Sequence, residues 1–324
     1  MRGREVGSSH LQRWLLNGRN QPTLAIGVVP RERYSLAAKA IQSIFEHTKL
    51  DFELIVVDNC TPSRYWSEIE GVLAGHENVR IIRTDEVLMP SPCKQLIAEV
   101  CTQELICLTE NDVIVTEGWL PPLIEALQER SADVVAPLVL EDSIDTAHGD
   151  MNVGRLSFRE SDEGTRLEIV PDVENSEELG QLEGISEIEV AENHCLLFRT
   201  EVVCRLKPFE EPLSTREFID SSLILKQAGA RVVFQPASRV IFMSPPPVEP
   251  DEMRFYMDKW NLDRAAWSHE RIKEKWGVVS IPESFHFVRD RLQRRSRWRW
   301  ALFTFRQNLR RQASRLYRRG AGNG

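Results

Sequence analysis

The sequence predicts an α/β fold in which a mostly parallel sheet carries helices on both faces. Three observations support this prediction. Short apolar runs recur in the first half of the chain, the stretches between them place apolar residues at helical spacing, and the two patterns alternate. A continuous apolar run is typical of a strand covered on both faces, and alternation with helices is typical of parallel strand pairs. The runs that we interpret as strands are 24–29, 53–57, 79–82, 105–108 and 134–139.

Each run is followed by a segment with the features of a helix. An apolar stripe over residues 36–45 predicts a helix, with Ser35 placed to cap it. The second strand ends at Asp58 and Asn59, and Ser63 is placed to cap the next helix. Further helices are expected through 96–100 and 119–127.

Residues 105–119, LICLTENDVIVTEGW, carry the strongest chemical signal. Their first apolar run ends in two carboxylates one residue apart, Glu110 and Asp112. A strand that delivers two acids at its carboxyl end places negative charge where open α/β sheets bind ligands. Two nearby carboxylates repel each other, so they need a cation or a shared proton. A divalent metal that holds a diphosphate would meet this need, and a pair of acids on a solvated turn is the simpler alternative.

The character of the chain changes at Glu141. Residues 159–193 contain twelve acids and two bases, with sparse and partly alternating apolar residues. This segment is interpreted as loop-rich with short strands, either an antiparallel flap or a solvated acidic insertion. Later elements are expected as a strand at 194–199, a helix near 218–226 closed by Gly229, strands at 231–234 and 240–242, a linker at 244–247, and one or two helices within 251–276.

Bulk composition bounds the class of protein. A hydrophobic share of 42% and a charged share of 28% are ordinary for a globular protein. The net charge of −8 argues against nucleic acid as a partner. No apolar run approaches the roughly 20 residues of a membrane span, and the N-terminus lacks the pattern of a secretory signal. Six cysteines without a CxxC pair indicate reduced thiols and a cytoplasmic protein.

The segment LAIGVVPRERYSLAAKAIQSIFEHTKLDFELIVVDNCTP resembles the opening of family-2 glycosyltransferases of the GT-A fold. Further likenesses follow in the family's order. Glu110-Asn111-Asp112 resembles the D-x-D metal motif, and Gly118-Trp119-Leu120 lies at the usual distance from it. Thr146–Gly149 resembles the stretch before the acceptor region. Glu217–Asp220, followed by Gly229 and Phe234-Gln235-Pro236, is similar to the acceptor-side pattern E-D-x-D-L…G…P. Phe255-Tyr256…Lys259-Trp260…Lys275-Trp276-Gly277 resembles one bacterial branch of these enzymes.

The resemblance implies a GT-A domain over residues 21–285, with a nucleotide half at about 21–140 and an acceptor half at about 141–285. Residues 1–20 would be a flexible arm, and residues 286–324 an Arg-rich amphipathic tail. The implied activity is transfer of a sugar, as in hexosyltransferases, from a UDP- or GDP-linked donor to a glycan or lipid-linked hydroxyl. Inversion at the anomeric carbon is implied as well.

The resemblance also implies a site. Asp112, with Glu110 assisting, would hold Mn²⁺ or Mg²⁺ against the leaving diphosphate. For several candidates a structural alternative stays open: solvated side chains for Arg31, Arg33 and His148, a turn residue for Asp58, and an exposed helical lysine for Lys94. The residues expected to contact the nucleotide-sugar are Pro30, Arg31, Arg33, Asp58, Asn59, Lys94, Glu110, Asn111 and His148.

On the acceptor side, a carboxylate must take the proton from the incoming hydroxyl. Glu217 and Asp220 are three residues apart, so they share one helical face. Glu217 is the preferred base and Asp220 its neighbour, although the reverse assignment stays open. Both acids would also suit a helix N-terminus without any catalytic role.

The chain departs from the family pattern at four places. Glu110 replaces the first acid of D-x-D, and Lys94-Gln95 stands where the family usually has Arg-Asn. Phe218 replaces an Asp that often serves as base. Phe242 replaces a histidine, which puts a third metal ligand in doubt.

The C-terminal tail suggests a surface partner. From Arg289 onward there are twelve arginines and one acid, and residues 289–319 form a basic amphipathic pattern with tryptophans. Such a helix suits an anionic membrane surface, which would place the protein at the inner face of the cell membrane. Docking of the tail on the acidic segment or on a partner subunit is the alternative.

Three rival functions were weighed. A nucleotidyltransferase would need a glycine-rich phosphate loop, and Val29–Glu32 contains no glycine. A non-catalytic nucleotide-sugar-binding module would explain the departures at Phe218 and Phe242. A membrane-associated scaffold would explain the basic tail.

Overall fold

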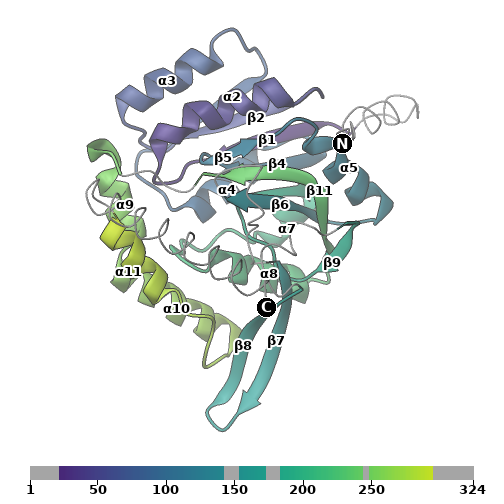
Figure 1. The fold of residues 1–324 in the computed structure, drawn as a ribbon, viewed down its shortest axis with the longest axis vertical. Coiled ribbons are helices and arrows are strands. Elements are labelled where there is room, and N and C mark those ends of the chain that lie inside the picture. Colours follow the sequence, from purple (N-terminus) through teal and green to yellow (C-terminus); the bar gives the residue numbers. More distant parts are fainter. Residues whose placement is uncertain (1–21, 142–152, 173–182, 244–247, 295–324) are drawn as a thin grey trace, which may run out of the picture.

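The computed structural model describes residues 22–141, 153–172, 183–243 and 248–294. Within these residues, one nine-stranded sheet has the order β3-β2-β1-β4-β10-β6-β11-β5, and β9 pairs with β11 beside this path (Figure 1). β7 and β8 form a separate two-stranded sheet. The strands are β1 (Leu24–Val29), β2 (Glu53–Asp58), β3 (Val79–Arg83), β4 (Leu105–Glu110), β5 (Val113–Val115), β6 (Val134–Glu141), β7 (Gly154–Ser161), β8 (Gly164–Pro171), β9 (Ser186–Ile188), β10 (Cys195–Arg199) and β11 (Val232–Phe242).

Helices connect most of these strands and cover both faces of the sheet, as the sequence predicts. The helices are η1 (Tyr34–Leu36), α2 (Ala37–His47), α3 (Ser63–Leu73), α4 (Pro90–Val100), α5 (Leu120–Glu129), α7 (Thr200–Leu206), α8 (Glu217–Gln227), η2 (Pro250–Glu252), α9 (Met253–Lys259), α10 (Leu262–Trp276) and α11 (Phe285–Arg294).

The sheet is parallel on its N-terminal side and mixed beyond it. β1, β2, β3 and β4 pair in parallel, and β6 pairs in parallel with β11. β10 lies antiparallel between β4 and β6, and β5 and β9 lie antiparallel to β11. An antiparallel strand needs no crossover helix, and neither β5 nor β10 is preceded by one.

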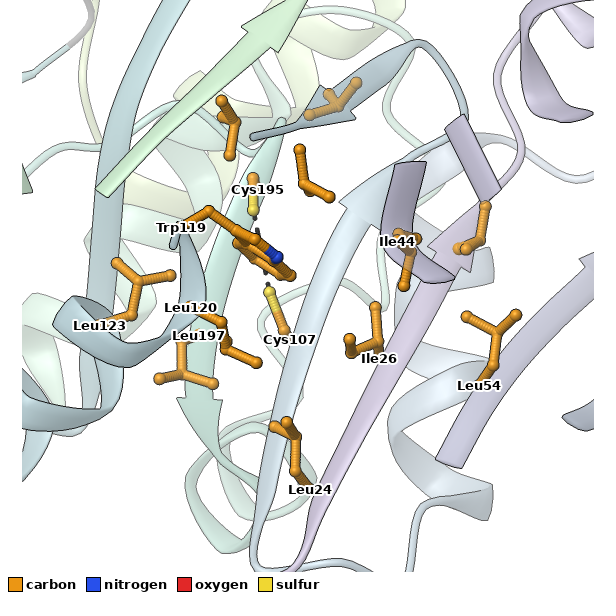
Figure 2. Close-up of a cluster of buried hydrophobic side chains, with 14 of the residues drawn as sticks. Leu24, Ile26, Ile44, Leu54, Cys107, Trp119, Leu120, Leu123, Cys195 and Leu197 are labelled. Atoms are coloured by element: carbon orange, nitrogen blue, oxygen red, sulfur yellow. Dashed lines mark hydrogen bonds between the residues drawn. The ribbon is translucent and has the colours of Figure 1, made fainter. Parts of the chain in front are cut away.

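Two hydrophobic cores lie on opposite faces of the sheet. One contains side chains of α2, α3 and α5, and Figure 2 shows Ile44 and Leu123 converging with Trp119 on the strands. In this core the Sγ atoms of Cys107 and Cys195 lie 3.8 Å apart as thiols. The other core contains α4 and α7. All six cysteines are free, and three of them, Cys93, Cys107 and Cys195, are buried.

Gly27 sets how closely α4 approaches the sheet. A Cβ atom at Gly27 would lie 2.5 Å from Cγ2 of Ile97, so any larger residue would push α4 away from β1. α4 carries Lys94, so this close approach also fixes the depth of a candidate site residue.

The acidic segment forms the antiparallel flap that the sequence suggests. β7 and β8 pair along their full length from Gly154↔Pro171 to Ser161↔Gly164, and the hairpin projects from the body of the domain (Figure 1). Its base is anchored because Leu156 and Leu167 pack against α8 and α10.

Three local predictions differ from the structure. Ser35 lies inside η1 and its buried hydroxyl has no hydrogen-bond partner among the described residues, while its amide donates to Glu252. Ser63 is the first residue of α3, and no side chain caps that helix. The strands expected at 231–234 and 240–242 are one strand, β11, with a register shift between Gln235 and Arg239. Pro236 explains the interruption because it cannot donate to the ladder.

The described end of the chain packs on the domain. α11 begins at Phe285, and its Val288 is fully buried against Tyr256 and Trp260. Figure 1 shows α11 beside α10. No helix in the described residues is long and apolar enough to cross a bilayer. The N-terminal arm, Thr146–Gly149 with His148, the linker at 244–247 and the tail beyond residue 294 lie outside the described residues.

Candidate functional site

The loop after β1 is buried, which excludes the alternative of solvated arginines. Pro30 ends the strand, and Arg31 and Arg33 are only 7% and 1% exposed. The Nε atom of Arg33 lies 3.2 Å from a carboxylate oxygen of Glu252. Glu252 also accepts the amide of Ser35, so this ion pair ties the loop to the start of α9. Arg33 therefore serves as a structural clamp of the loop.

Glu110, the last residue of β4, is the centre of a buried charge cluster. One of its oxygens lies 2.7 Å from Nζ of Lys94, and the other contacts Arg31 at 2.5 Å and Nδ1 of His194 at 2.6 Å. Burial alone would raise the pKa of Glu110, but Arg31, Lys94 and His194 together hold it well below its usual range. Lys94 is 1% exposed, so it is no solvated helical lysine.

Of the two acids Glu110 and Asp112, it is Asp112 whose carboxylate is left incompletely hydrogen-bonded. Its buried Oδ1 has no hydrogen bond among the described residues. Burial raises the pKa of Asp112 to about 6, with Arg31 opposing the shift and Glu110 adding to it. A buried carboxylate is costly unless a cation or donors compensate it. Asp112 thus has a buried oxygen that no hydrogen bond from the described residues satisfies.

Asn111 separates the two acids and fixes the loop opposite them. Its Oδ1 accepts the amide of Arg31 at 3.0 Å, and its Nδ2 donates to the carbonyl oxygen of Arg33 at 3.4 Å. Because the carboxamide is occupied by backbone groups, Asn111 shapes the site rather than reaching into it.

His194 is a site residue that the sequence reasoning missed. It directly precedes β10, and the pairing of Cys195 with Thr109 places it beside Glu110. Its ring stacks on Phe242 with centroids 4.2 Å apart. Burial would lower the pKa of His194, but Glu110 raises it to about 9.

The imidazole therefore comes from a different strand than the family pattern suggests. Phe242 occupies the position of the expected histidine, and His194 stacks against it. Ligand atoms of Glu110, Asp112 and His194 all lie within 4.8 Å of one another, so the three could hold a metal ion. Only the antiparallel insertion of β10 brings this histidine to the acids.

The end of β2 is held by local contacts. Oδ2 of Asp58 lies 3.0 Å from Arg83, and its Oδ1 accepts the amide of Thr61. The side chain of Asn59 bonds both the amide and the carbonyl of Leu88. The turn interpretation is therefore supported for both residues, and Asp58 is buried at the carboxyl end of β2 with 9% exposure.

The two acids of α8 have different surroundings. Glu217 faces a pocket, where its Oε1 lies 3.8 Å from Nζ of Lys259. Asp220 is enclosed, since its two oxygens contact Nζ of Lys275 at 2.8 Å and the indole nitrogen of Trp276 at 2.7 Å. Asp220 is thus an anchor between α8 and α10, and Glu217 is the acid that can meet a ligand.

The pocket in front of Glu217 has a volume of about 240 Å³. Arg31 and His194, the outer members of the buried charge cluster, form its floor. Its remaining walls include the aromatic side chains of Phe218, Phe242, Trp260 and Phe287. A ligand in this pocket would therefore lie between the charge cluster and the α8 carboxylate.

Comparisons with known proteins agree with this geometry. The sequence model of the glycosyl transferase family 2 matches residues 28–185, which include the end of β1, Glu110, Asp112 and the β7–β8 hairpin. No curated protein sequence matches the chain significantly.

Two similar solved structures have the same fold. One is GalNAc-T7 with UDP, GalNAc and Mn²⁺, at a TM-score of 0.55 and 15% identity, covering 89% of this chain and 57% of that chain. The other is S. aureus TarS 1–349 in complex with UDP-GlcNAc, at a TM-score of 0.52 and 11% identity, covering 81% of this chain and 75% of that chain. Residues 28–185 of this chain therefore match glycosyl transferase family 2, and the described residues have the GT-A fold.

Proposed function

We propose that the protein transfers a sugar from a nucleotide-diphosphate sugar to a hydroxyl acceptor. The observation that carries the proposal is the unpartnered, buried Oδ1 of Asp112 at the carboxyl end of β4, within a family-2 segment. The two similar solved structures are complexes with UDP or a UDP-sugar, which supports a UDP-linked donor over a GDP-linked one.

Asp112 would hold a divalent cation, Mn²⁺ or Mg²⁺, because hard cations prefer carboxylate oxygens. His194 offers a second ligand atom in the same cluster. Glu110 already contacts Arg31, Lys94 and His194, so its part is to keep these groups in place. The bound cation would neutralise the charge that develops on the leaving diphosphate.

Arg31 lies between the cluster and the pocket, where it adds positive charge on the same side. Of the other predicted nucleotide contacts, Asp58 has the most suitable position, buried at the carboxyl end of β2 and paired with Arg83. A ribose or base would reach Asp58 beside the exposed side chain of Arg83.

Glu217 would act as general base on the acceptor hydroxyl. It faces the pocket, whereas Asp220 is held by Lys275 and Trp276. Its Oε1 lies 3.8 Å from Nζ of Lys259, and a carboxylate at this place in the pocket can take the proton of a hydroxyl. Direct displacement by the activated hydroxyl would invert the anomeric carbon.

The acceptor is proposed to be a glycan or a lipid-linked hydroxyl. Contact of residues 289–319 with an anionic membrane at the cytoplasmic face stays a prediction from the sequence. A binding module without turnover is the second candidate, and the favouring observation is Phe218 at a position where the family often has its base.

Thermal unfolding with a panel of UDP- and GDP-sugars, with and without Mn²⁺, tests the proposal. We expect at least one donor to raise Tm only with the metal, and Asp112→Ala to abolish this shift. Asp162→Asn at the exposed tip of the hairpin is the matched control and should keep it. Equal shifts for the parent and Asp112→Ala would contradict the metal site. A donor that binds but never releases UDP with any acceptor, or by slow hydrolysis, would favour the binding module.

A further inference from the structure

Arg291 is a cation of the pocket that forms no ion pair with the described residues. Its guanidinium lines the cavity that contains Glu217. Among the described residues no carboxylate pairs with Arg291, and its buried Nε has no hydrogen-bond partner. Two other basic residues of the pocket differ, because Arg31 pairs with Glu110 and Lys259 with Glu217.

Aromatic rings hold this guanidinium in place. Its central carbon lies 4.8 Å from the ring centroid of Phe287 and 5.6 Å from that of Trp260. Such contacts stabilise a cation through the faces of the rings but satisfy none of its N–H groups. The N–H groups of Arg291 therefore remain available for an acceptor in the pocket.

The backbone under Arg291 is fixed as well. Val288, one turn earlier on α11, is fully buried, and the hydroxyl of Tyr256 donates to the carbonyl oxygen of Arg291 at 2.8 Å. The indole nitrogen of Trp260 donates to Glu32 at 2.7 Å, so the ring that packs on Arg291 is also bonded to the loop beside the charge cluster. The guanidinium thus has a defined position relative to the reacting groups.

We propose that Arg291 binds a phosphate group carried by a substrate in this pocket. A guanidinium presents its donors as a planar fork that matches two phosphate oxygens, and a partly desolvated one without a counter-ion favours an anion. The inference rests on the proposed function and makes Arg291 a determinant of substrate specificity.

The phosphate has two sources, a phosphorylated acceptor and the diphosphate of the donor. The position of Arg291 favours the acceptor. It shares the pocket with Glu217, and α8, α9 and α11 all lie outside residues 28–185, the part that the family model matches. This wall therefore lies outside the segment that contains the nucleotide half.

Binding titrations of the full chain with Mn²⁺ distinguish the sources. The probes are UDP, uridine, and orthophosphate added to the UDP-loaded protein. The variants are Arg291→Gln and Arg291→Lys, and the matched control is Arg289→Gln, an exposed arginine on the same helix. Thermal unfolding of each variant verifies folding, and Arg291→Lys keeps the test informative if Arg291→Gln does not fold.

We expect Arg291→Gln to weaken orthophosphate binding about 10- to 100-fold, with UDP affinity unchanged, which assigns an acceptor phosphate. The orthophosphate affinity of Arg291→Lys should lie between those of the parent and Arg291→Gln, because lysine keeps the positive charge but lacks the planar pair of donors of a guanidinium. A matching loss of UDP affinity with unchanged uridine affinity would also support the proposal but assign the donor diphosphate.

Orthophosphate and UDP affinities that equal those of the parent in both Arg291 variants would overturn the proposal. Failure of the proposed function gives a different result. In that case the parent binds no nucleotide, while orthophosphate alone still binds in a manner that depends on Arg291.

Discussion

The Nδ1 atom of His194 lies 2.6 Å from a carboxylate oxygen of Glu110, across 84 positions of the chain. This contact exists because β10 runs antiparallel beside β4 and brings its first residues to the carboxyl end of that strand. It gives the site an imidazole that the family pattern, with Phe242 in the histidine position, does not suggest.

Replacing His194 should destabilise the protein in a pH-dependent manner. The pKa of His194 is raised from 6.5 to about 9, because Glu110 outweighs the effect of burial. The stabilisation is therefore complete below about pH 6.5 and is lost as the pH rises through 9. We expect His194→Gln to lower the free energy of unfolding by up to roughly 3 kcal/mol at pH 6. Urea unfolding at pH 6 and 9.5 measures this, and an equal difference at both pH values would contradict it.

Replacing Asp112 should stabilise the metal-free protein. Burial raises its pKa from 3.8 to about 6, so the folded state is penalised fully above pH 6 and not at all below about pH 3.8. In EDTA, Asp112→Asn should be more stable than the parent by about 1 to 3 kcal/mol at pH 8, and the difference should vanish near pH 4. Chemical denaturation across this range is the measurement. A variant that is less stable at pH 8 would rule out the uncompensated acid.

The acids of α8 should separate activity from stability. Glu217→Gln is expected to lower kcat about 100- to 10,000-fold, because it removes the general base, and to keep Tm within a few degrees. Asp220→Asn should instead cost about 2 to 4 kcal/mol of stability, since it breaks the enclosed contact with Lys275. UDP release and urea unfolding are measured for both variants. The opposite distribution of effects would make Asp220 the base.

The role of Arg33 as a clamp is tested by a double-mutant cycle. Arg33→Met leaves the carboxylate of Glu252 buried without its cation, which should cost about 3 to 5 kcal/mol. Adding Glu252→Gln should recover part of this loss, because the uncompensated charge disappears. UDP affinity measured below the unfolding transition should be unchanged. A specific loss of UDP binding would instead make Arg33 a nucleotide contact.

Much of the fold could be predicted because its signals are local. The strands around Ile26, Val56 and Leu108 are continuous apolar runs, and the stripe through Ile41 and Ile44 has clear helical spacing. These patterns follow from covering both faces of a sheet, and the structure has each element within a few residues of its predicted bounds. The acids Glu110 and Asp112 were found for the same reason, since they directly follow such a run.

What the sequence did not reveal depends on contacts between distant segments. His194 joins the acids only through an antiparallel pairing, and no short-range pattern marks that register. Arg33 looks like a solvated residue until Glu252, from a segment more than 200 positions away, is placed beside it. Ser35 could not cap α2 because the preceding turn continues directly into the helix, which leaves no cap position at that residue.

The burial of Val288 has a practical consequence for anyone who shortens this protein. α11 begins where the sequence suggests a detachable basic tail, yet it seals a hydrophobic cluster and supplies one wall of the pocket. A shortened version that stops at residue 285 would expose Tyr256 and Trp260 to water and open the cavity on one side. The shortest self-sufficient catalytic unit should therefore retain residues through Arg294, and only cuts beyond it can isolate what the basic extension contributes.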